Sequence, residues 1–437
     1  MDKTKILEVL NDWNYWNKDI IDTKKRDFYD HKIANFLKND EIIVLKGVRR
    51  SGKSTLLINQ IKQLINNKID KEDILFVNLE DPRFINHLDV ELLENIKDTY
   101  LQYLNPKSKP YIFLDEVQNI SNWEKWVNKE YELKKSNLII TGSNSSMLSS
   151  EIATTLSGRY LSCTVYPLSF KEYLGFLNIN IKSMLDFVQH KIKIMRAFEE
   201  YLLYGAFPKV PFYPKEQKKD LLITYKDSIL LKDIVARYKL KDFYKLEEIA
   251  AFLLSNSGII QSINKLKNNF SISFDMASSY IEYLKNAYMI FEIKKFDYSL
   301  KKQNVNEKKY YSIDLGLSNI YRVPNLQNRG NDIESIVFLE LLRRDYQVFY
   351  YKTSNDLECD FVVQKGNKIV KLIQVSTTLK TQKTKDREIA GLFKSMQELK
   401  LDEKEVKLLI IAEDQDSKIE YQNSAIEVVN ILKWLLL

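Results

Sequence analysis

A stretch in the first part of the chain combines glycine, lysine and serine at the spacing of a phosphate-binding loop. Its residues are Gly47, Val48, Arg49, Arg50, Ser51, Gly52, Lys53 and Ser54, followed by Thr55. They fit the pattern GxxxxGK[ST], in which glycines let backbone N–H groups approach phosphate oxygens closely. Lys53 would contact the β- and γ-phosphates of a nucleotide, and the Ser54 hydroxyl would bind Mg²⁺. The spacing therefore predicts a nucleotide-binding site.

Two adjacent acids, Asp115 and Glu116, follow the apolar run 111–114. At the end of a buried strand, such a pair supplies the second half of a nucleotide-hydrolysing site. Asp115 would hold Mg²⁺ through a water molecule, and Glu116 would orient and deprotonate the attacking water. A chance acid pair at an exposed strand end is the alternative, but the distance from the phosphate loop suits a nucleotide-binding fold.

Polar residues also follow the apolar run 137–140. Thr141, Ser143 or Asn144 could contact the γ-phosphate from this strand, and we favour Ser143 and Asn144. Further along, Arg159 could act in trans on the nucleotide of a neighbouring subunit and stabilise charge in the transition state. A structural ion pair is the equal alternative for Arg159.

Buried strands and helices alternate around these residues. Run 41–45 predicts a strand that enters the phosphate loop, and run 55–65 predicts an amphipathic helix that leaves it. Run 73–79 predicts a further strand followed by Glu80 and Asp81, either of which could face the γ-phosphate. A turn carboxylate before Pro82 is the equal alternative. The alternation predicts an α/β fold with a parallel sheet, whose ligands gather at the carboxyl ends of the strands.

The chain resembles a large prokaryotic group of AAA-type ATPases whose C-terminal region has long been catalogued as a domain of unknown function. The resemblance rests on the phosphate loop and on these further segments: 114–118, Trp123, 141–143, 157–160, 167–170, 204–208 and 311–317. It covers nearly the whole chain. It implies that the nucleotide is ATP and that the partner is DNA, with branched DNA as one form.

Composition is that of a folded protein with more than one domain. The chain has 437 residues, of which 45% are apolar and 29% are charged. Cys163 and Cys359 lack any pairing or metal-binding spacing, and the three histidines are scattered, so neither disulfides nor a zinc site are expected. No apolar run reaches the roughly 20 residues of a membrane span, and no signal-peptide pattern opens the chain. We therefore expect a cytoplasmic protein without membrane contact.

Positive charge is concentrated in the middle of the chain. Residues 207–310 hold 19 Lys+Arg against 12 Asp+Glu, a difference of +7 that equals the net charge of the whole chain. Such a segment favours a polyanion as partner. The alternative is that these lysines only solvate a helical surface.

Part of this segment, 241–325, has the pattern of a winged-helix domain. Three helices are expected at 245–256, 261–267 and 275–285, and two β-runs at 289–296 and 309–313, with a polar turn at 300–306. In such a domain the third helix reads a DNA groove and the wing contacts phosphate, here through Lys301, Lys302, Lys308 and Lys309. Many winged helices bind protein instead.

The C-terminal region resembles the restriction-endonuclease-like fold, which carries the PD-(D/E)xK motif. The expected elements are a helix at 333–344 and strands at 347–351, 358–363 and 371–376. The resemblance implies that Glu334 and Asp360 stand at Mg²⁺-ligand positions. Gln374 stands where the second acid belongs, and Ser376 stands where the lysine belongs. Glutamine is a poorer Mg²⁺ ligand than a carboxylate, and serine supplies no positive charge.

We therefore expect the C-terminal domain to keep this fold but to cut DNA poorly or not at all. Residues 331–437 hold 16 Lys+Arg against 18 Asp+Glu, which gives no basic groove by count. Cleavage would require Lys352 or Lys380 to take the role of the missing lysine.

The expected fold class is α/β, with a parallel P-loop ATPase core, a winged-helix domain and a degenerate nuclease-like α/β domain. The expected domains are an N-terminal helical segment (1–40), the ATPase core (41–175), a helical connector (176–240), the winged helix (241–325) and the nuclease-like domain (326–437).

The expected function is a Mg²⁺-dependent ATPase that couples ATP binding and hydrolysis to DNA binding or remodelling. A homo-oligomer follows if Arg159 acts in trans. The alternatives are an ATP-driven switch that binds protein partners, and an active ATP-dependent nuclease.

Overall fold

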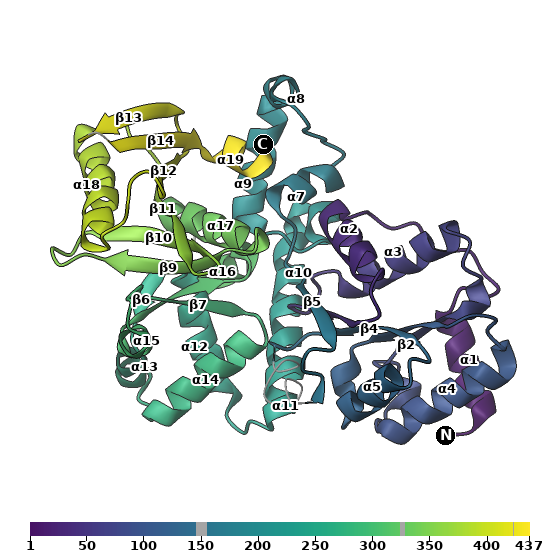
Figure 1. The fold of residues 1–437 in the computed structure, drawn as a ribbon. Helices are drawn as coiled ribbons and strands as arrows, with labels where there is room; N and C mark the ends of the chain where they lie inside the picture. The colour runs from purple at the N-terminus through teal and green to yellow at the C-terminus, as the bar shows by residue number, and fades with distance from the viewer. Residues whose placement is uncertain (146–154, 324–327, 423) are drawn as a thin grey trace. The chain divides into compact units, whose positions relative to one another are not determined.

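The structure, a computed structural model, describes residues 1–145, 155–323, 328–422 and 424–437 (Figure 1). The chain forms two compact units. The first comprises Met1–Tyr166 with Asn286–Tyr288, and the second comprises Pro167–Lys285 with Met289–Leu437. The helices of residues 1–40 thus belong to the same compact unit as the ATPase core. Across the described ranges, no helix has the length and apolarity needed to cross a bilayer.

The first unit is built on a sheet of five strands in the order β2-β3-β4-β1-β5, and all of their pairings are parallel. The strands are β1 (Ile42–Lys46), β2 (Ile74–Asn78), β3 (Tyr111–Asp115), β4 (Asn137–Gly142) and β5 (Tyr160–Thr164). This confirms the predicted parallel core. Since β1 pairs with β4, the phosphate loop and the polar residues after β4 leave neighbouring strands at the same edge.

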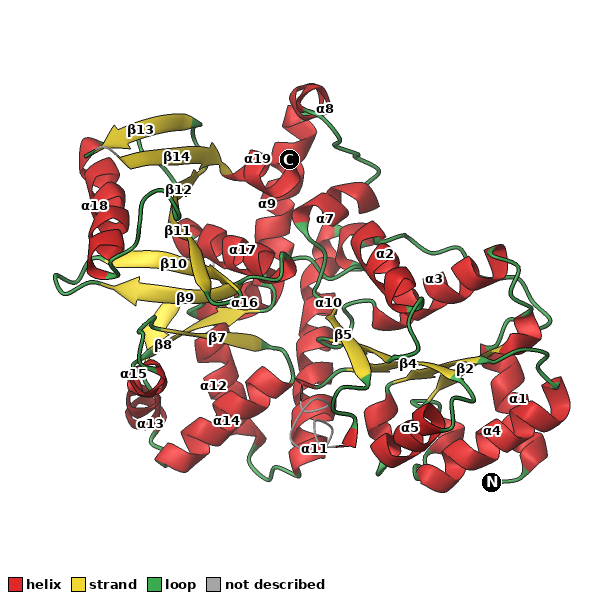
Figure 2. Cartoon of the chain, in the orientation of Figure 1, coloured by secondary structure: helices red, strands yellow, loops and turns green. Residues whose placement is uncertain are grey.

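Helices cover both faces of this sheet (Figures 1 and 2). They are α1 (Lys3–Trp13), α2 (Asp27–Phe36), α3 (Lys53–Asn66), α4 (Val90–Leu104) and α5 (Trp123–Glu132). Alternate residues of β1 enter two different cores: Ile42 and Val44 pack with α1, α4 and α5, whereas Ile43 and Leu45 pack with α2 and α3. Burial on both faces explains why the strand reads as an unbroken apolar run.

The two N-terminal tryptophans dock onto the sheet. The Trp13 indole N–H donates to Asp81 Oδ2 at 2.8 Å, and the Trp16 indole N–H donates to the Ile74 carbonyl at 2.9 Å. Trp13 is the last residue of α1, and Trp16 lies in the segment that follows this helix.

The second unit begins with helices that connect to the C-terminal modules. They are α7 (Phe170–Phe176), α8 (Met184–Gln189), α9 (Lys191–Tyr204), α10 (Lys215–Ser228), a π-helical turn (Ile229–Val235) and α11 (Ala236–Tyr238). After α9, the Ala206 N–H donates to Asp314 Oδ2 at 2.6 Å. A Cβ on Gly205 would lie 2.0 Å from Asp314 Oδ1, and Gly205 has a φ of +73°. Segments 204–208 and 311–317 of the sequence therefore pair with each other in the fold.

A small three-stranded antiparallel sheet with helices occupies residues 243–312 of the second unit. Its elements are α12 (Phe243–Ser255), β6 (Ile259–Gln261), α13 (Ile263–Phe270), α14 (Phe274–Asn286), β7 (Ile290–Lys294), α15 (Leu300–Val305) and β8 (Lys308–Ser312), with strand order β6-β8-β7. The three predicted helices and two β-runs are present. The predicted turn at 300–306 is wrong, because the segment forms α15. It contains no glycine or proline, and the buried Gln303 donates to the Asp297 carbonyl at 2.6 Å.

The C-terminal module is a mixed six-stranded sheet in the order β13-β14-β12-β11-β10-β9. Its elements are α17 (Arg329–Arg343), β9 (Gln347–Lys352), β10 (Glu358–Lys365), β11 (Lys368–Ser376), α18 (Gln382–Glu398), β12 (Lys407–Ala412), β13 (Ser417–Tyr421), β14 (Ser424–Asn430) and α19 (Ile431–Leu436), preceded by α16 (Leu315–Tyr321). In Figure 1 this module runs from green to yellow. The helix and the three strands predicted for its first half are confirmed.

Candidate nucleotide site

The phosphate loop requires glycine at the two glycine positions of its pattern, Gly47 and Gly52, for steric reasons. A Cβ on Gly47 would lie 2.2 Å from the Val165 carbonyl oxygen, closer than two such atoms can approach. Gly52 has a φ of +98°, a conformation that side chains rarely adopt, and it begins α3. The loop therefore passes tightly beside β5 and delivers Lys53 to the first turn of the helix.

Lys53 is buried at the centre of the loop. Its Nζ donates to the carbonyls of Gly47 and Val48 at 3.1 and 3.2 Å. It lies 3.6 Å from Glu116 Oε1, which is beyond a close hydrogen bond. The ammonium is thus held mainly by main-chain oxygens, which the oxygens of a phosphate group could replace.

The acids at the end of β3 are positioned by Thr141 on β4. The Thr141 hydroxyl donates to Asp115 Oδ1 at 2.5 Å and accepts from the Glu116 N–H at 2.9 Å. The Ser54 side chain is also hydrogen-bonded to Asp115. The two residues predicted as metal ligands are therefore brought together, although they lie far apart in the sequence.

The two acids titrate differently. Burial, together with the charge of Glu116, raises the pKa of Asp115 to about 6. Burial also opposes ionisation of Glu116, but the charges of Lys53 and Arg49 and hydrogen bonds from Gln118 and Ser143 outweigh it and lower its pKa. Glu116 is consequently a carboxylate at neutral pH and able to accept a proton.

Ser143 and Asn144 lie beside these acids, at the end of β4, and both are fully buried. The Gln118 amide donates to Glu116 Oε2 at 2.5 Å and to Ser143 Oγ at 3.3 Å. Gln118 is a contact residue of the site that our sequence analysis did not single out. Its position two residues after Glu116, in the turn that leaves β3, is the signal that could have found it.

Two arginines brace the phosphate loop. The buried Arg26, which precedes α2, donates through Nη1 to the carbonyls of Ser51 and Tyr166 at 2.9 and 3.0 Å. Arg49 pairs with Glu80 at 2.7 Å. Of the two acids after β2, Glu80 therefore lies at the loop, whereas Asp81 accepts hydrogen bonds from Trp13 and from Arg83.

Arg159 is paired within its own chain. Its guanidinium lies 2.7 Å from Glu132 Oε1 and also contacts the Asn128 side chain, both on α5. This arrangement is the ion pair that we gave as the alternative to a role in trans.

The residues predicted in the C-terminal module gather around a second set of charges. We call Glu334 on α17 together with Glu358 and Asp360 on β10 the acidic centre. The Lys309 ammonium, from β8, lies 2.8 Å from Glu334 Oε1 and also contacts Glu358. Burial acts to lower the pKa of Lys309, but Glu334 and the other acids outweigh it and raise this pKa well above its usual value. The Tyr311 hydroxyl donates to the same Glu334 oxygen.

The two motif positions that depart from the nuclease pattern are engaged in local hydrogen bonds. The Gln374 side chain accepts from the Asp360 N–H at 2.7 Å and donates to Glu388 at 2.8 Å. The Ser376 hydroxyl donates to the Thr378 carbonyl at 3.0 Å. Both side chains therefore stabilise strand ends.

Of the four lysines predicted to contact DNA, Lys309 does not fit that prediction. It is 3% exposed because it fills the acidic centre, so it cannot lie on a DNA-binding surface. Lys301 and Lys302 on α15 are exposed, and the half-buried Lys308 donates to the Asn304 carbonyl at 2.6 Å. Lys352, one candidate for the missing nuclease lysine, instead pairs with Asp356 at 2.9 Å.

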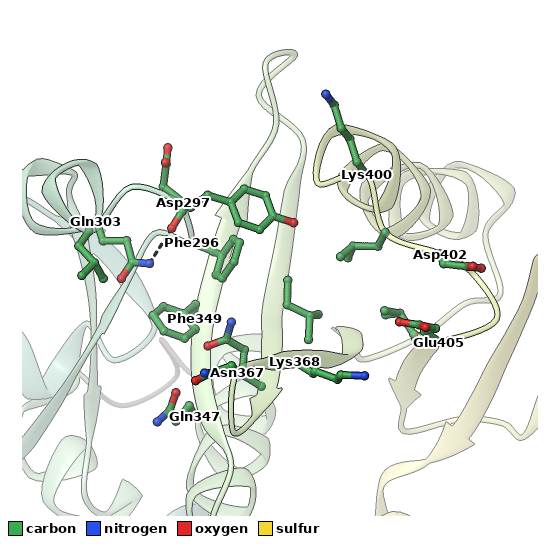
Figure 3. A pocket seen from close by; sticks show the side chains of 16 residues that line it. Phe296, Asp297, Gln303, Gln347, Phe349, Asn367, Lys368, Lys400, Asp402 and Glu405 are labelled. Carbon is green, nitrogen blue, oxygen red and sulfur yellow. Dashed lines mark hydrogen bonds between the residues drawn. The ribbon is translucent and has the colours of Figure 1, made fainter.

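Among the residues that the structure describes, the second unit contains several cavities, and two of them border the C-terminal module. One, of about 550 Å³, is lined by residues that include Lys309, Glu334, Asp360, Gln374 and Arg387. The other, of about 600 Å³, lies beside β9 and has a lining of mixed character (Figure 3). Its side chains include the aromatic pair Phe296 and Phe349, the amides of Gln347 and Asn367, and the charged residues Asp297, Lys368, Lys400, Asp402 and Glu405. This mixture gives the second cavity no excess of positive charge.

Comparison with known families gives three matches along the chain. Residues 39–174 match an AAA domain, residues 195–327 match a domain of unknown function (DUF8612), and residues 329–433 match another (DUF4143). An uncharacterized protein of Methanocaldococcus jannaschii is 34% identical over 94% of this chain and 92% of its own length. An uncharacterized protein of Haemophilus influenzae is 34% identical over 79% of this chain and 85% of its own length.

Solved structures give more distant likenesses. A Walker-type ATPase of Pyrococcus abyssi is 15% identical, with a TM-score of 0.43, over 69% of this chain and 97% of that chain. The Aeropyrum pernix ORC1 protein in complex with DNA is 10% identical, with a TM-score of 0.33, over 75% of this chain and 95% of that chain.

Proposed function

We propose that this chain uses ATP hydrolysis with Mg²⁺ to change how it holds DNA. The chain belongs to the family of P-loop ATPases whose AAA domain is followed by two domains of unknown function. The observation that carries the ATPase is the convergence of Lys53, Ser54, Asp115 and Glu116 at one edge of the parallel sheet. These residues come from two different strand ends, and each offers the group that phosphoryl transfer needs.

The proposed roles follow from the contacts. Lys53 exchanges its main-chain partners for phosphate oxygens and offsets their charge. Ser54 and Asp115 hold Mg²⁺, which supplies further positive charge to the β- and γ-phosphates when bound. Glu116, a carboxylate at neutral pH, orients the attacking water and accepts its proton. Ser143 and Asn144 contact the γ-phosphate, and Gln118 links Ser143 to Glu116.

The test is ATP hydrolysis by the wild type, Lys53→Ala and Lys62→Ala. Lys62 is on the same helix but pairs with the exposed Asp22, so it serves as the matched control. We expect hydrolysis to fall by at least about 100-fold in Lys53→Ala, because removal of one group that stabilises transition-state charge costs about that much. Lys62→Ala should keep the wild-type rate. Hydrolysis that survives in Lys53→Ala would contradict the assignment.

The proposal of DNA as the partner is supported by exposed lysines. Residues 243–312 contain three helices and a small antiparallel sheet, which are the elements that a winged helix requires. Lys301 and Lys302 are exposed on α15, and Lys267 is exposed on α13. The exposed side of α14 is less suited to a groove, because it carries Asp275 and Glu282. We therefore propose contact with phosphates through α15 and α13, in place of base reading by α14.

Binding of duplex, single-stranded and four-way-junction DNA across a salt series tests this partner. Lys301→Glu/Lys302→Glu should weaken binding and reduce the slope of log affinity against log salt by about 2, since each phosphate contact contributes roughly 0.9. Lys404→Glu/Lys418→Glu, at two other exposed lysines, is the matched control. Unchanged DNA affinity in the α15 variant would instead favour the protein-binding switch.

We further propose that the C-terminal module has the nuclease-like fold but does not cut DNA, because Gln374 and Ser376 are engaged in local hydrogen bonds. Incubation of the full chain with DNA and Mg²⁺ or Mn²⁺ should yield no product. Product that disappears in Asp360→Ala would overturn this proposal.

A homo-oligomer is proposed only in connection with Arg159, which would have to leave Glu132 to reach the nucleotide of a neighbour. Specific ATPase activity that rises with protein concentration, and that is lost in Arg159→Ala, is the expected signature. Activity independent of concentration would assign Arg159 to the ion pair alone.

A further inference from the structure

The acidic centre already contains a cation that the chain supplies itself. Lys309 reaches it from β8, a strand of the small sheet, whereas Glu334 and Glu358 belong to the C-terminal module. The ammonium lies 2.8 Å from Glu334, contacts Glu358, and has the Tyr350 ring 5.9 Å away at its centroid. One positive charge therefore lies against Glu334, one of the two acids that the nuclease resemblance places at a metal site.

The oxygen atoms of the acidic centre do not fit a divalent metal while this lysine is present. Mg²⁺ requires about six oxygens at roughly 2.0–2.1 Å in an octahedral arrangement. Glu334 Oε1 accepts from both Lys309 and Tyr311, and Asp360 Oδ2 accepts from the Val375 N–H at 2.8 Å. Among the residues that the structure describes, no three His, Cys, Asp or Glu side chains are arranged to hold a metal ion.

Solvent ions can nevertheless reach these atoms. The cavity of about 550 Å³ is lined by Lys309, Glu334, Glu358 and Asp360, and the Arg387 side chain on its wall is largely exposed. Access is therefore not what keeps a metal out. The obstacle is the way the acids are arranged around the ammonium: no three of the described acids are placed to hold a metal, and a divalent cation in the position of the ammonium would meet a fixed positive charge at contact distance.

We propose that Lys309 is a built-in replacement for a metal ion: it occupies the acidic centre between Glu334 and Glu358, excludes divalent cations, and ties β8 to α17 and β10. The module then has an acidic centre that carries its own cation and needs no metal. Shortening the lysine would leave the carboxylates without their cation beside the cavity, where they could rearrange and offer oxygen ligands to a divalent ion.

The test measures Mn²⁺ binding by calorimetry to the full chain without nucleotide. Every variant carries Asp115→Asn, which removes the metal ligand proposed at the phosphate loop. This parent should bind no Mn²⁺ in the C-terminal module. Adding Lys309→Ala should create one site per chain and raise Mn²⁺ affinity more than about tenfold. Adding Asp360→Asn as well should abolish that site. A folded Lys309→Ala protein that gains no Mn²⁺ affinity would overturn the proposal.

A second comparison needs no change at Lys309, in case Lys309→Ala fails to fold. The parent and its Asp360→Asn derivative should be alike in binding no Mn²⁺. If the parent binds Mn²⁺ and the derivative does not, the centre holds a metal in the presence of Lys309, and the proposal is wrong. Circular dichroism of each variant establishes that the fold is kept.

Discussion

The phosphate-loop site and the acidic centre each hold one buried lysine beside carboxylates, and they differ in what the lysine contacts. Lys53 and Lys309 are both 3% exposed, so burial does not distinguish them. Lys53 is held by two main-chain carbonyls and stands 3.6 Å from Glu116, whereas Lys309 is 2.8 Å from Glu334 and also contacts Glu358. The first lysine can exchange its partners for a ligand, and the second is already satisfied by the protein. We therefore call the phosphate-loop site the open site and the acidic centre the closed site, although both are built from lysine and carboxylates.

The largest expected effect is on hydrolysis at the open site. Glu116→Gln keeps the size of the side chain but cannot accept a proton, and a general base contributes about 10²–10⁴-fold to rate. We expect ATP turnover to fall by that factor while binding of a fluorescent ATP analogue persists. Glu91→Gln, at an exposed position on α4, is the control and should behave as wild type. Wild-type turnover in Glu116→Gln would contradict the assignment of Glu116 as the general base of the phosphate-loop site.

The closed site should matter most for stability. Lys309→Met leaves Glu334 and Glu358 without their buried cation, and removing one partner of a buried ion pair costs about 3–5 kcal/mol. We expect urea unfolding of the second unit to shift by that amount. Lys301→Met, at an exposed lysine on α15, should change stability by less than about 0.5 kcal/mol. Equal changes in the free energy of unfolding in the two variants would show that Lys309 does not stabilise the acidic centre.

Asp314 is a buried acid that accepts hydrogen bonds mainly from main-chain N–H groups, with the charge of Arg343 as a smaller influence. Burial, which outweighs hydrogen bonds from the Ala206, Leu317 and Gly316 N–H groups, raises its pKa to about 6. The folded chain therefore binds a proton that the unfolded chain has released. Stability is fully present below about pH 4 and falls as pH rises to about 6, by up to about 3 kcal/mol. Unfolding free energies of the wild type and Asp314→Asn across this range should diverge accordingly. A difference that does not change with pH would contradict the assignment.

A smaller effect should follow from Thr141, which positions both acids of the open site. Thr141→Val removes the donor to Asp115 and the acceptor for the Glu116 N–H while keeping the shape of the side chain. We expect kcat to fall about 30-fold, since two hydrogen bonds of roughly 1 kcal/mol each are lost. Thr141→Ser should restore the rate, because it retains the hydroxyl. Failure of serine to restore it would assign the loss to packing.

The open site was readable from the sequence because its parts are local. The phosphate loop is one continuous segment, and Asp115 and Glu116 end a strand whose apolar run is unmistakable. What the sequence did not yield were contacts made across the fold, such as Arg26 to Ser51 and Gln118 to Ser143.

The acidic centre could be predicted only in part, because it is built from contacts between distant segments of the chain. The helix and strands that carry Glu334 and Asp360 were predicted from their patterns. Lys309, however, looks like one of several lysines in a basic segment, and its partner Glu334 lies 25 residues further along the chain. A lysine is expected at the surface because of its charge. The position of Lys309 in the protein interior follows from the pairing of β8 with its neighbouring strands, which the sequence does not reveal.

The central claim is that the chain has one site open to a metal and one closed by its own lysine. Counting the Mn²⁺ ions bound per chain, in the presence of a non-hydrolysable ATP analogue, tests it most directly. We predict one Mn²⁺ per chain in the wild type and none in Asp115→Asn. Two ions in the wild type, or one that persists in Asp115→Asn and disappears in Asp360→Asn, would contradict the account.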